Sequence, residues 1–201
     1  HHVVPSLAEM TSAGPAWMID QPDIMRTDWD GVCRTTPSGP QLPDGNLEPQ
    51  VCKSWISATG DAGWGGVLAE VWLAKTAKPI WITYTQEQQN LIIPLLIEAT
   101  ALLPEKDRWR ATFSTYATNI PEAFECRVQC LIAGTQAARI AAAKGSVINL
   151  SKGNQPPKPS PWTEYAASGQ YVAGLPFPKA QARNHFSPLD RQKQIAEVIR
   201  K

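Results

Sequence analysis

The sequence lacks two features that would quickly assign it to a class of protein: a long apolar segment and a cluster of basic residues. No apolar run approaches the roughly 20 residues that a membrane-spanning helix needs. The 19 lysines and arginines are balanced by 18 aspartates and glutamates, so the formal net charge is only +1, and the basic residues are scattered. Nucleic-acid binders that depend on phosphate contacts gather their positive charge on one surface. We therefore expect neither a membrane span nor a nucleic-acid partner.

Histidine and cysteine are also scarce, which bears on metal binding and on disulfides. The three histidines, two at the start of the chain and one at position 185, are too few and too far apart for a metal site, so we expect no metal or cofactor. The cysteines include no C-x-x-C pair. We favour free thiols in a cytoplasmic protein, with a Cys33–Cys52 disulfide as the alternative. The four cysteines are Cys33, Cys52, Cys126 and Cys130.

The strongest apolar patterning lies between residues 78 and 151. Residues 78–84 are rich in β-branched and aromatic side chains, which is typical of a strand. Thr85 followed by Gln88 has the capping-box pattern of a helix that begins directly after the threonine. That helix is apolar on all sides, so we expect it to be covered on more than one face, and Pro94 should kink or restart it.

Two further strands are indicated downstream. Residues 110–116 alternate between apolar and polar side chains, and residues 126–132 place Val128 on one face and Gln129 on the other. Each strand is therefore expected to have a core side and a solvent side. The loop between them contains Pro121 and favours an antiparallel hairpin.

A short alanine-rich helix and a last strand complete this core. Gly134-Thr135 opens the helix, Gly145 is placed to end it, and residues 146–150 form the strand. The resulting order is βαββαβ, an α/β fold that is either ferredoxin-like or a small open Rossmann-like sheet, since the sequence does not fix the strand order. Each crossover within the sheet should be right-handed.

The rest of the chain is arranged around this core. Residues 1–77 are loop-rich and mainly helical, and we expect them to pack on the α/β core of residues 78–151. Residues 152–201 begin with the Pro-rich stretch GNQPPKPSPW, which predicts an extended, poorly packed linker followed by a tail. Four aromatic residues of this tail are expected to fold back over the core and cover an edge strand. They are Trp162, Tyr165, Tyr171 and Phe177.

A glycine-rich segment at residues 60–66 comes nearest to a ligand-binding motif. Asp61 is a good N-cap, Gly60 and Gly65 have the spacing of the two glycines of a phosphate-binding loop, and residues 55–59 before them read as a strand. The lysine and hydroxyl positions that should follow hold glycine and valine instead. Backbone N–H groups can still bind an anion here, and close packing of the small residues is the structural alternative. The candidate anion-binding residues are Gly60, Asp61, Gly63, Gly65 and Gly66.

No arrangement of reactive side chains stands out. The carboxylates are not paired at a helical spacing with a histidine or with one another, Ser114 and Ser151 lack a G-x-S-x-G elbow, and Cys130 has no histidine nearby in sequence. Glu98 is the most unusual group because it interrupts an apolar helix. A place at the helix periphery is the simpler interpretation, with a buried acid–base group as the alternative. The acids considered are Asp61, Glu70, Glu98, Glu122 and Glu125.

Three segments together resemble one bacterial protein family. They are HHVV…GPAWMI near the start, W…TGDAGW…VLA in the middle, and RWRATFSTY…IPEAFECRVQCLIAGT further on. As a set they are similar to the GTPase-associated protein 1 family of planctomycetes and other multidomain-rich bacteria. The resemblance touches most of residues 1–151 and does not extend to the tail.

This resemblance implies a non-catalytic scaffold or adaptor module of a larger bacterial protein, working with a GTPase-type NTPase in a conflict or regulatory system. It supplies no catalytic residues. The chain starts without methionine and has no signal-peptide pattern, so we expect a part of a longer protein. The adaptor would dock a GTPase, or neighbouring domains of the same polypeptide, through exposed apolar surface or an unprotected sheet edge. The alternatives are a nucleotide-binding or hydrolytic enzyme domain that uses residues 60–66, and a structural module outside the cytoplasm.

Overall fold

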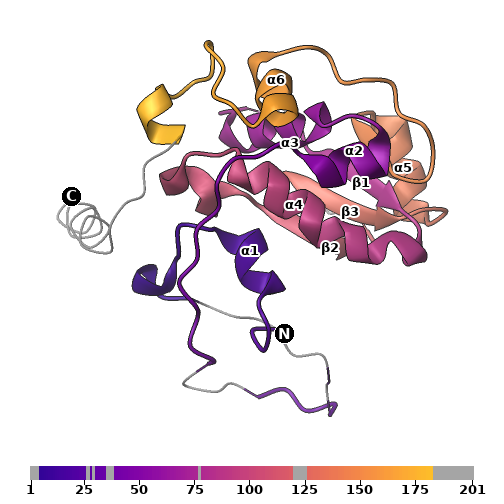
Figure 1. Ribbon diagram of the computed structural model, residues 1–201. Helices are drawn as coiled ribbons and strands as arrows, with labels where there is room; N and C mark the ends of the chain where they lie inside the picture. Colours follow the sequence, from indigo (N-terminus) through magenta and orange to yellow (C-terminus); the bar gives the residue numbers. More distant parts are fainter. Residues whose placement is uncertain are drawn as a thin grey trace.

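A four-stranded parallel sheet with the order β2-β3-β1-β4 lies at the centre of the molecule. The computed structural model describes residues 5–25, 28, 30–34, 39–76, 78–119 and 126–182 (Figure 1). The α/β class and the βαββαβ order of the core are confirmed. The strands are β1 (Ile80–Tyr84), β2 (Phe113–Ala117), β3 (Val128–Ile132) and β4 (Val147–Asn149).

The antiparallel hairpin expected between the second and third strands is wrong. β2 pairs with β3 in parallel, with Phe113 opposite Val128. Alternating polarity shows which face of a strand is buried but not the direction in which the strand runs, and the connection was long enough for the chain to return to the opposite end of the sheet. All four strands run parallel, so the core is an open parallel sheet rather than the antiparallel sheet of a ferredoxin-like domain.

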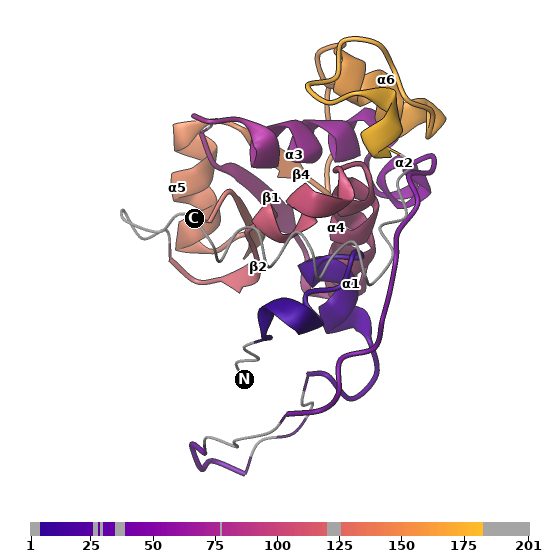
Figure 2. The same ribbon diagram turned by 90° about the vertical axis from the view of Figure 1, so that its left-hand side faces the viewer.

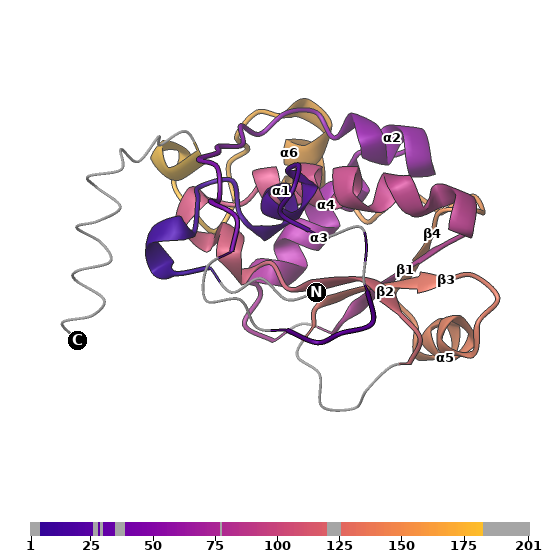
Figure 3. The same ribbon diagram turned by 90° about the horizontal axis from the view of Figure 1, so that it is seen from below.

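Two helices cross over from strand to strand on opposite faces of this sheet. Helix α4 (Ile92–Ala101) follows β1 and leads to β2, whereas α5 (Gln136–Lys144) follows β3 and leads to β4. The two crossovers run in opposite directions across the sheet, and Figure 3 shows α5 on one side and α4 on the other. Both therefore have the same hand, as the right-handed rule requires.

The two faces of the sheet are covered unequally. The face toward α4 is part of the large core, in which Ile82, Tyr84 and Cys130 are fully buried. The other face carries a small cluster in which Trp81 and Leu131 contact α5 through three alanines. The expected solvent side of β3 is wrong, because Gln129 on this face is only 3% exposed. The three alanines are Ala137, Ala138 and Ala141.

The chain around α4 largely follows its local signals. The Thr85–Gln88 capping box is present and opens the 3-10 turn η2 (Gln86–Leu91), after which α4 begins at Ile92. Pro94 therefore sits in the first turn of α4, where its missing N–H leaves no hydrogen bond unmade. The strand expected at residues 110–116 starts three residues late, because η3 (Glu105–Arg110) occupies the preceding stretch.

In the described portion of the N-terminal part, four helical elements precede the sheet. η1 and α1 lie on either side of Gly14, and α2 and α3 join α4 on the same face of the sheet. Within the described residues, no helix is long and apolar enough to cross a bilayer. The elements are η1 (Leu7–Glu9), α1 (Pro15–Asp20), α2 (Lys53–Thr59) and α3 (Gly63–Leu73).

A buried arginine, Arg108 in η3, fastens the N-terminal part to the core. Its guanidinium donates hydrogen bonds to the carbonyl oxygens of Ser12 and Leu47, both at 2.6 Å. It also donates to the carbonyls of Leu103 and Ala101 at the end of α4, at 3.2 and 3.3 Å. Burial lowers the pKa of Arg108 to about 10, so the group remains charged at neutral pH.

The tail folds back over the core as expected, but it covers a helix rather than an edge strand. Helix α6 (Pro161–Ser168) lies on α3, as Figure 2 shows, and η4 (Lys179–Ala182) follows. Trp162 and Tyr165 are buried, and Phe177 packs against both of their rings. The segment between β4 and α6 contains no helix or strand, but it is not loose, because its Pro157 lies against Gly63 of α3.

Candidate functional site

The glycine-rich segment forms a turn between two helices. Gly60 ends α2 in a left-handed conformation with a φ of +85°, and the Asp61 carboxylate accepts a hydrogen bond from the Gly63 N–H at 2.7 Å at the start of α3. The strand expected at residues 55–59 is wrong, because these residues belong to α2. A phosphate-binding loop follows a strand, so its structural setting is absent from this turn.

Three of these glycines allow close packing. A Cβ on Gly66 would collide with the Trp162 carbonyl of α6, and one on Gly65 would lie 2.9 Å from the Cys52 sulfur. A Cβ on Gly63 would lie 2.8 Å from Pro157, whereas Gly60 faces open space. The packing interpretation thus describes Gly63, Gly65 and Gly66. Anion binding by Gly60, Asp61 and these three glycines remains a prediction.

Glu98 on α4 caps a neighbouring helix. Its carboxylate accepts hydrogen bonds from the Ser54 N–H at 2.8 and 3.0 Å, from the Ser54 hydroxyl at 2.8 Å and from the Trp55 N–H at 3.3 Å. The Cys52 side chain, at the N-cap position of α2, forms no capping hydrogen bond. A carboxylate at a helix N-terminus accepts hydrogen bonds from N–H groups that have no partner within the helix, and its negative charge interacts favourably with the helix dipole. Glu98 is half-buried and has a structural role.

The other reactive groups that the sequence offered are dispersed. Glu70 is exposed on α3, and the Ser114 hydroxyl donates to the Tyr116 carbonyl at 2.8 Å. Burial raises the pKa of the Cys130 thiol, which makes it a poor nucleophile. All three histidines, together with Glu122 and Glu125, lie outside the described residues. Within the described part of the chain, no group of three or more His, Cys, Asp or Glu side chains is arranged to hold a metal.

Open α/β sheets usually bind ligands at the carboxyl ends of two neighbouring strands whose crossovers leave in opposite directions. In this sheet those two strands are β1 and β3. The polar side chains found there are used within the fold. The Gln88 amide oxygen accepts from the Thr85 N–H at 3.0 Å, and its nitrogen donates to the Leu150 carbonyl at 2.9 Å. The Thr135 hydroxyl accepts from the Ala138 N–H at 3.3 Å and caps α5.

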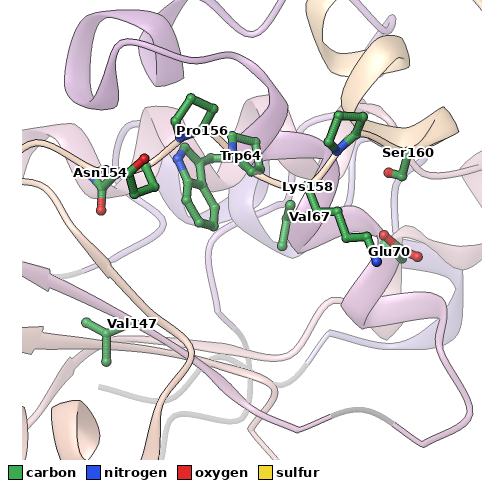
Figure 4. Close-up of a pocket in the computed structure, with 11 residues that line it drawn as sticks. Trp64, Val67, Glu70, Val147, Asn154, Pro156, Lys158 and Ser160 are labelled. Atoms are coloured by element: carbon green, nitrogen blue, oxygen red, sulfur yellow. The ribbon is translucent and has the colours of Figure 1, made fainter.

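A groove lies elsewhere, beside the edge strand β4. It has a volume of about 660 Å³ and is bounded by α3, by β4 and by the Pro-rich residues 154–160, which we call the strap. Figure 4 shows Trp64 under the strap and Val147 across the opening. This volume falls within the range of roughly 300–1,000 Å³ that is typical of ligand pockets. Trp64, Val67 and Glu70 line the groove from α3, one turn apart.

The backbone of β4 is open toward this groove. The Ser146 carbonyl accepts from the Trp81 N–H at 3.1 Å and the Leu150 N–H donates to the Thr83 carbonyl at 2.8 Å, so every second residue of β4 faces β1. The backbone groups of Val147 and Asn149 consequently point outward. Those of Asn149 are bound by the Asn154 side chain, whereas those of Val147 have no hydrogen-bond partner among the described residues.

Sequence reasoning missed this groove, although its parts were visible. The strap was read as a loose linker, and the packing of its prolines against Trp64 depends on α6 docking onto the glycines of α3. The available signal was the combination of the proline run in the strap with Trp64 on α3, since extended proline-rich segments dock against aromatic side chains. Arg108 was missed for another reason, since it lies in the charged run EKDRWR, which looks like solvent-exposed surface.

Comparison with known protein families finds a match to part of the chain. The model of a family described as GTPase-associated protein 1, middle domain, matches residues 52–152. This range contains α2, α3, α4, α5 and all four strands, and it ends before the strap. No curated protein and no solved structure matches the chain.

Proposed function

Because the chain belongs to the GTPase-associated protein 1 family, whose middle domain it contains, we propose that it is a non-catalytic scaffold or adaptor that docks a GTPase-type NTPase. It would act as a module of a larger bacterial protein, in a conflict or regulatory system. The proposal includes a cytoplasmic location, which the four free cysteines support.

One observation carries the adaptor proposal: β4 is an edge strand whose Val147 backbone groups have no partner among the described residues, and it stands beside an open, largely apolar groove. Unprotected sheet edges are recurrent sites of peptide recognition. The distinctive charged groups of the described core, Glu98 and Arg108, are engaged in holding helices and loops together. The chemistry that remains available at the surface is therefore better suited to docking than to catalysis.

A binding measurement tests this proposal. The full chain is titrated by calorimetry with a candidate GTPase-type partner, loaded with GDP or with a non-hydrolysable GTP analogue. We expect a 1:1 complex whose affinity depends on the bound nucleotide. Absence of heat in every nucleotide state would contradict the adaptor function.

The second candidate function is nucleotide binding or hydrolysis by this chain, using the turn at residues 60–66. The observation in its favour is the exposed, left-handed Gly60, which ends α2 shortly before α3 begins. Titration of the chain alone with GTP, GDP and ATP separates the two functions. Heat that is abolished by Asp61→Ala, with no requirement for the GTPase, would favour the nucleotide-binding function.

A further inference from the structure

We infer that the outer edge of β4 and the groove beside it bind an extended, apolar peptide segment of the GTPase-type partner, which adds a fifth strand to the sheet. This inference rests on the proposed function and specifies its docking surface. In this arrangement the backbone N–H and carbonyl of Val147 form the hydrogen bonds to the added strand.

Asn149 shows what kind of group this edge accepts. The Asn154 side-chain oxygen accepts from the Asn149 N–H at 2.9 Å, and the Asn154 side-chain nitrogen donates to the Asn149 carbonyl at 2.7 Å. A carboxamide carries the same donor and acceptor as a peptide unit. The Asn154 side chain thus takes the place of one residue of a neighbouring strand.

Val147 presents the same pair of groups two residues earlier. Its N–H and carbonyl point the same way as those of Asn149, and Val147 lines the groove. An incoming backbone that follows the direction set by the Asn154 amide would meet both groups. Main-chain hydrogen bonds of this kind supply affinity, and pockets beside the strand supply specificity.

The walls of the groove decide the chemistry of the occupant. Trp64, Val67 and the strap prolines offer apolar surface, and the two charged side chains, Glu70 and Lys158, have opposite signs. Neither of these two forms an ion pair within the described residues. A nucleotide or phosphate would need an excess of positive charge or clustered N–H donors. Because the charges balance, the groove is complementary to an uncharged, apolar segment.

Amide exchange of the full chain tests the inference directly. Amide exchange at Val147 is followed by NMR in ¹⁵N-labelled protein, free and with the GTPase loaded with a non-hydrolysable GTP analogue. We expect exchange of the Val147 N–H to slow at least tenfold in the complex, because that amide becomes a ladder donor. The Ile140 amide in α5, on the opposite face of the sheet, should change less than twofold.

The outcomes separate this inference from the function on which it rests. A complex that leaves Val147 exchange unchanged would overturn strand addition and retain the adaptor. Failure to form any complex would overturn both. Val147 protection that rises with chain concentration and without the GTPase would show a second copy on the edge, which also overturns the inference.

A pair of variants tests the wall of the groove. Val67→Asp places a charge on its apolar surface and should weaken GTPase binding at least tenfold. Ile56→Asp makes the same kind of change on α2, where Ile56 is 45% exposed, and should alter the affinity less than twofold. Equal losses in both variants would contradict the inference. If Val67→Asp does not fold, the exchange measurement on the unaltered chain still decides.

Discussion

At the scale of single residues, polar groups in unexpected places distinguish this core. Gln129 on β3 is buried, and its side-chain oxygen has no hydrogen-bond partner among the described residues. Trp81 lies opposite it on β1, and the Trp81 indole N–H is also without a partner there. Both side chains face the alanine-rich helix α5, which offers no side-chain donor or acceptor through its three core alanines. A buried polar atom without a partner costs stability.

Replacing Gln129 by methionine should therefore stabilise the protein. Gln129→Met keeps the length of the side chain and removes the unpaired carbonyl, and we expect a gain of about 1 kcal/mol in the free energy of unfolding, measured in urea. Gln89→Met, at an exposed position, serves as the control and should change stability by less than about 0.5 kcal/mol. A loss of stability in Gln129→Met would show that the amide has a partner in solution.

Arg108 gives the opposite prediction. Arg108→Met leaves the buried Ser12 carbonyl and the part-buried Leu47 carbonyl without this donor, and we expect a loss of about 3 kcal/mol. Arg110→Met removes an exposed arginine that pairs with Asp107, and it should cost less than about 1 kcal/mol. Urea unfolding of both variants provides the comparison. Similar losses in the two would mean that the buried network contributes little.

At the scale of elements, capping by a distant side chain links α2 to α4. Glu98→Gln removes the charge that faces the N-terminus of α2, and we expect a loss of about 1 kcal/mol. The amides of Ser54 and Trp55 should exchange faster with solvent, while Glu70→Gln on the exposed side of α3 leaves them unchanged. If both the stability and the exchange of these amides are unaltered in Glu98→Gln, the Glu98 charge does not stabilise the N-terminus of α2.

Local signals identified most elements but not their pairing. The capping box at Thr85, the stop at Gly145 and the alternation in β3 each depend on neighbouring residues, so they could be predicted from the sequence. The parallel direction of β2 could not, since it depends on the path of a connection rather than on a pattern. The position of the groove could not be predicted from the sequence for a similar reason, because the groove forms only when α6 reaches the glycines of α3.

At the scale of the whole molecule, helices that come before and after the sheet in the chain belong to the same core as the sheet. Leu68 and Trp72 of α3 and Tyr165 of α6 are buried in the cluster that contains the β1 side chains. A division at residues 77 and 151 therefore describes segments of sequence that pack together, and we propose that they unfold together.

A fragment test follows from this packing. We expect residues 78–151 alone to show no cooperative unfolding by circular dichroism, because the fragment lacks the helices that cover one face of its sheet. The full chain should unfold in a single transition. A cooperative transition in the fragment would establish it as an independent domain.

The central position of β1 also sets the order of events during synthesis. Ile80 pairs with Val128 and Trp81 pairs with Val147, so β1, which is buried at every position, emerges from the ribosome well before either of its neighbours exists. Pairings between distant parts of a chain form slowly, and unpaired apolar strands aggregate readily in the interval. We therefore expect the nascent protein to need protection by chaperones, or early docking of α3 and α4, until β3 and β4 have been made.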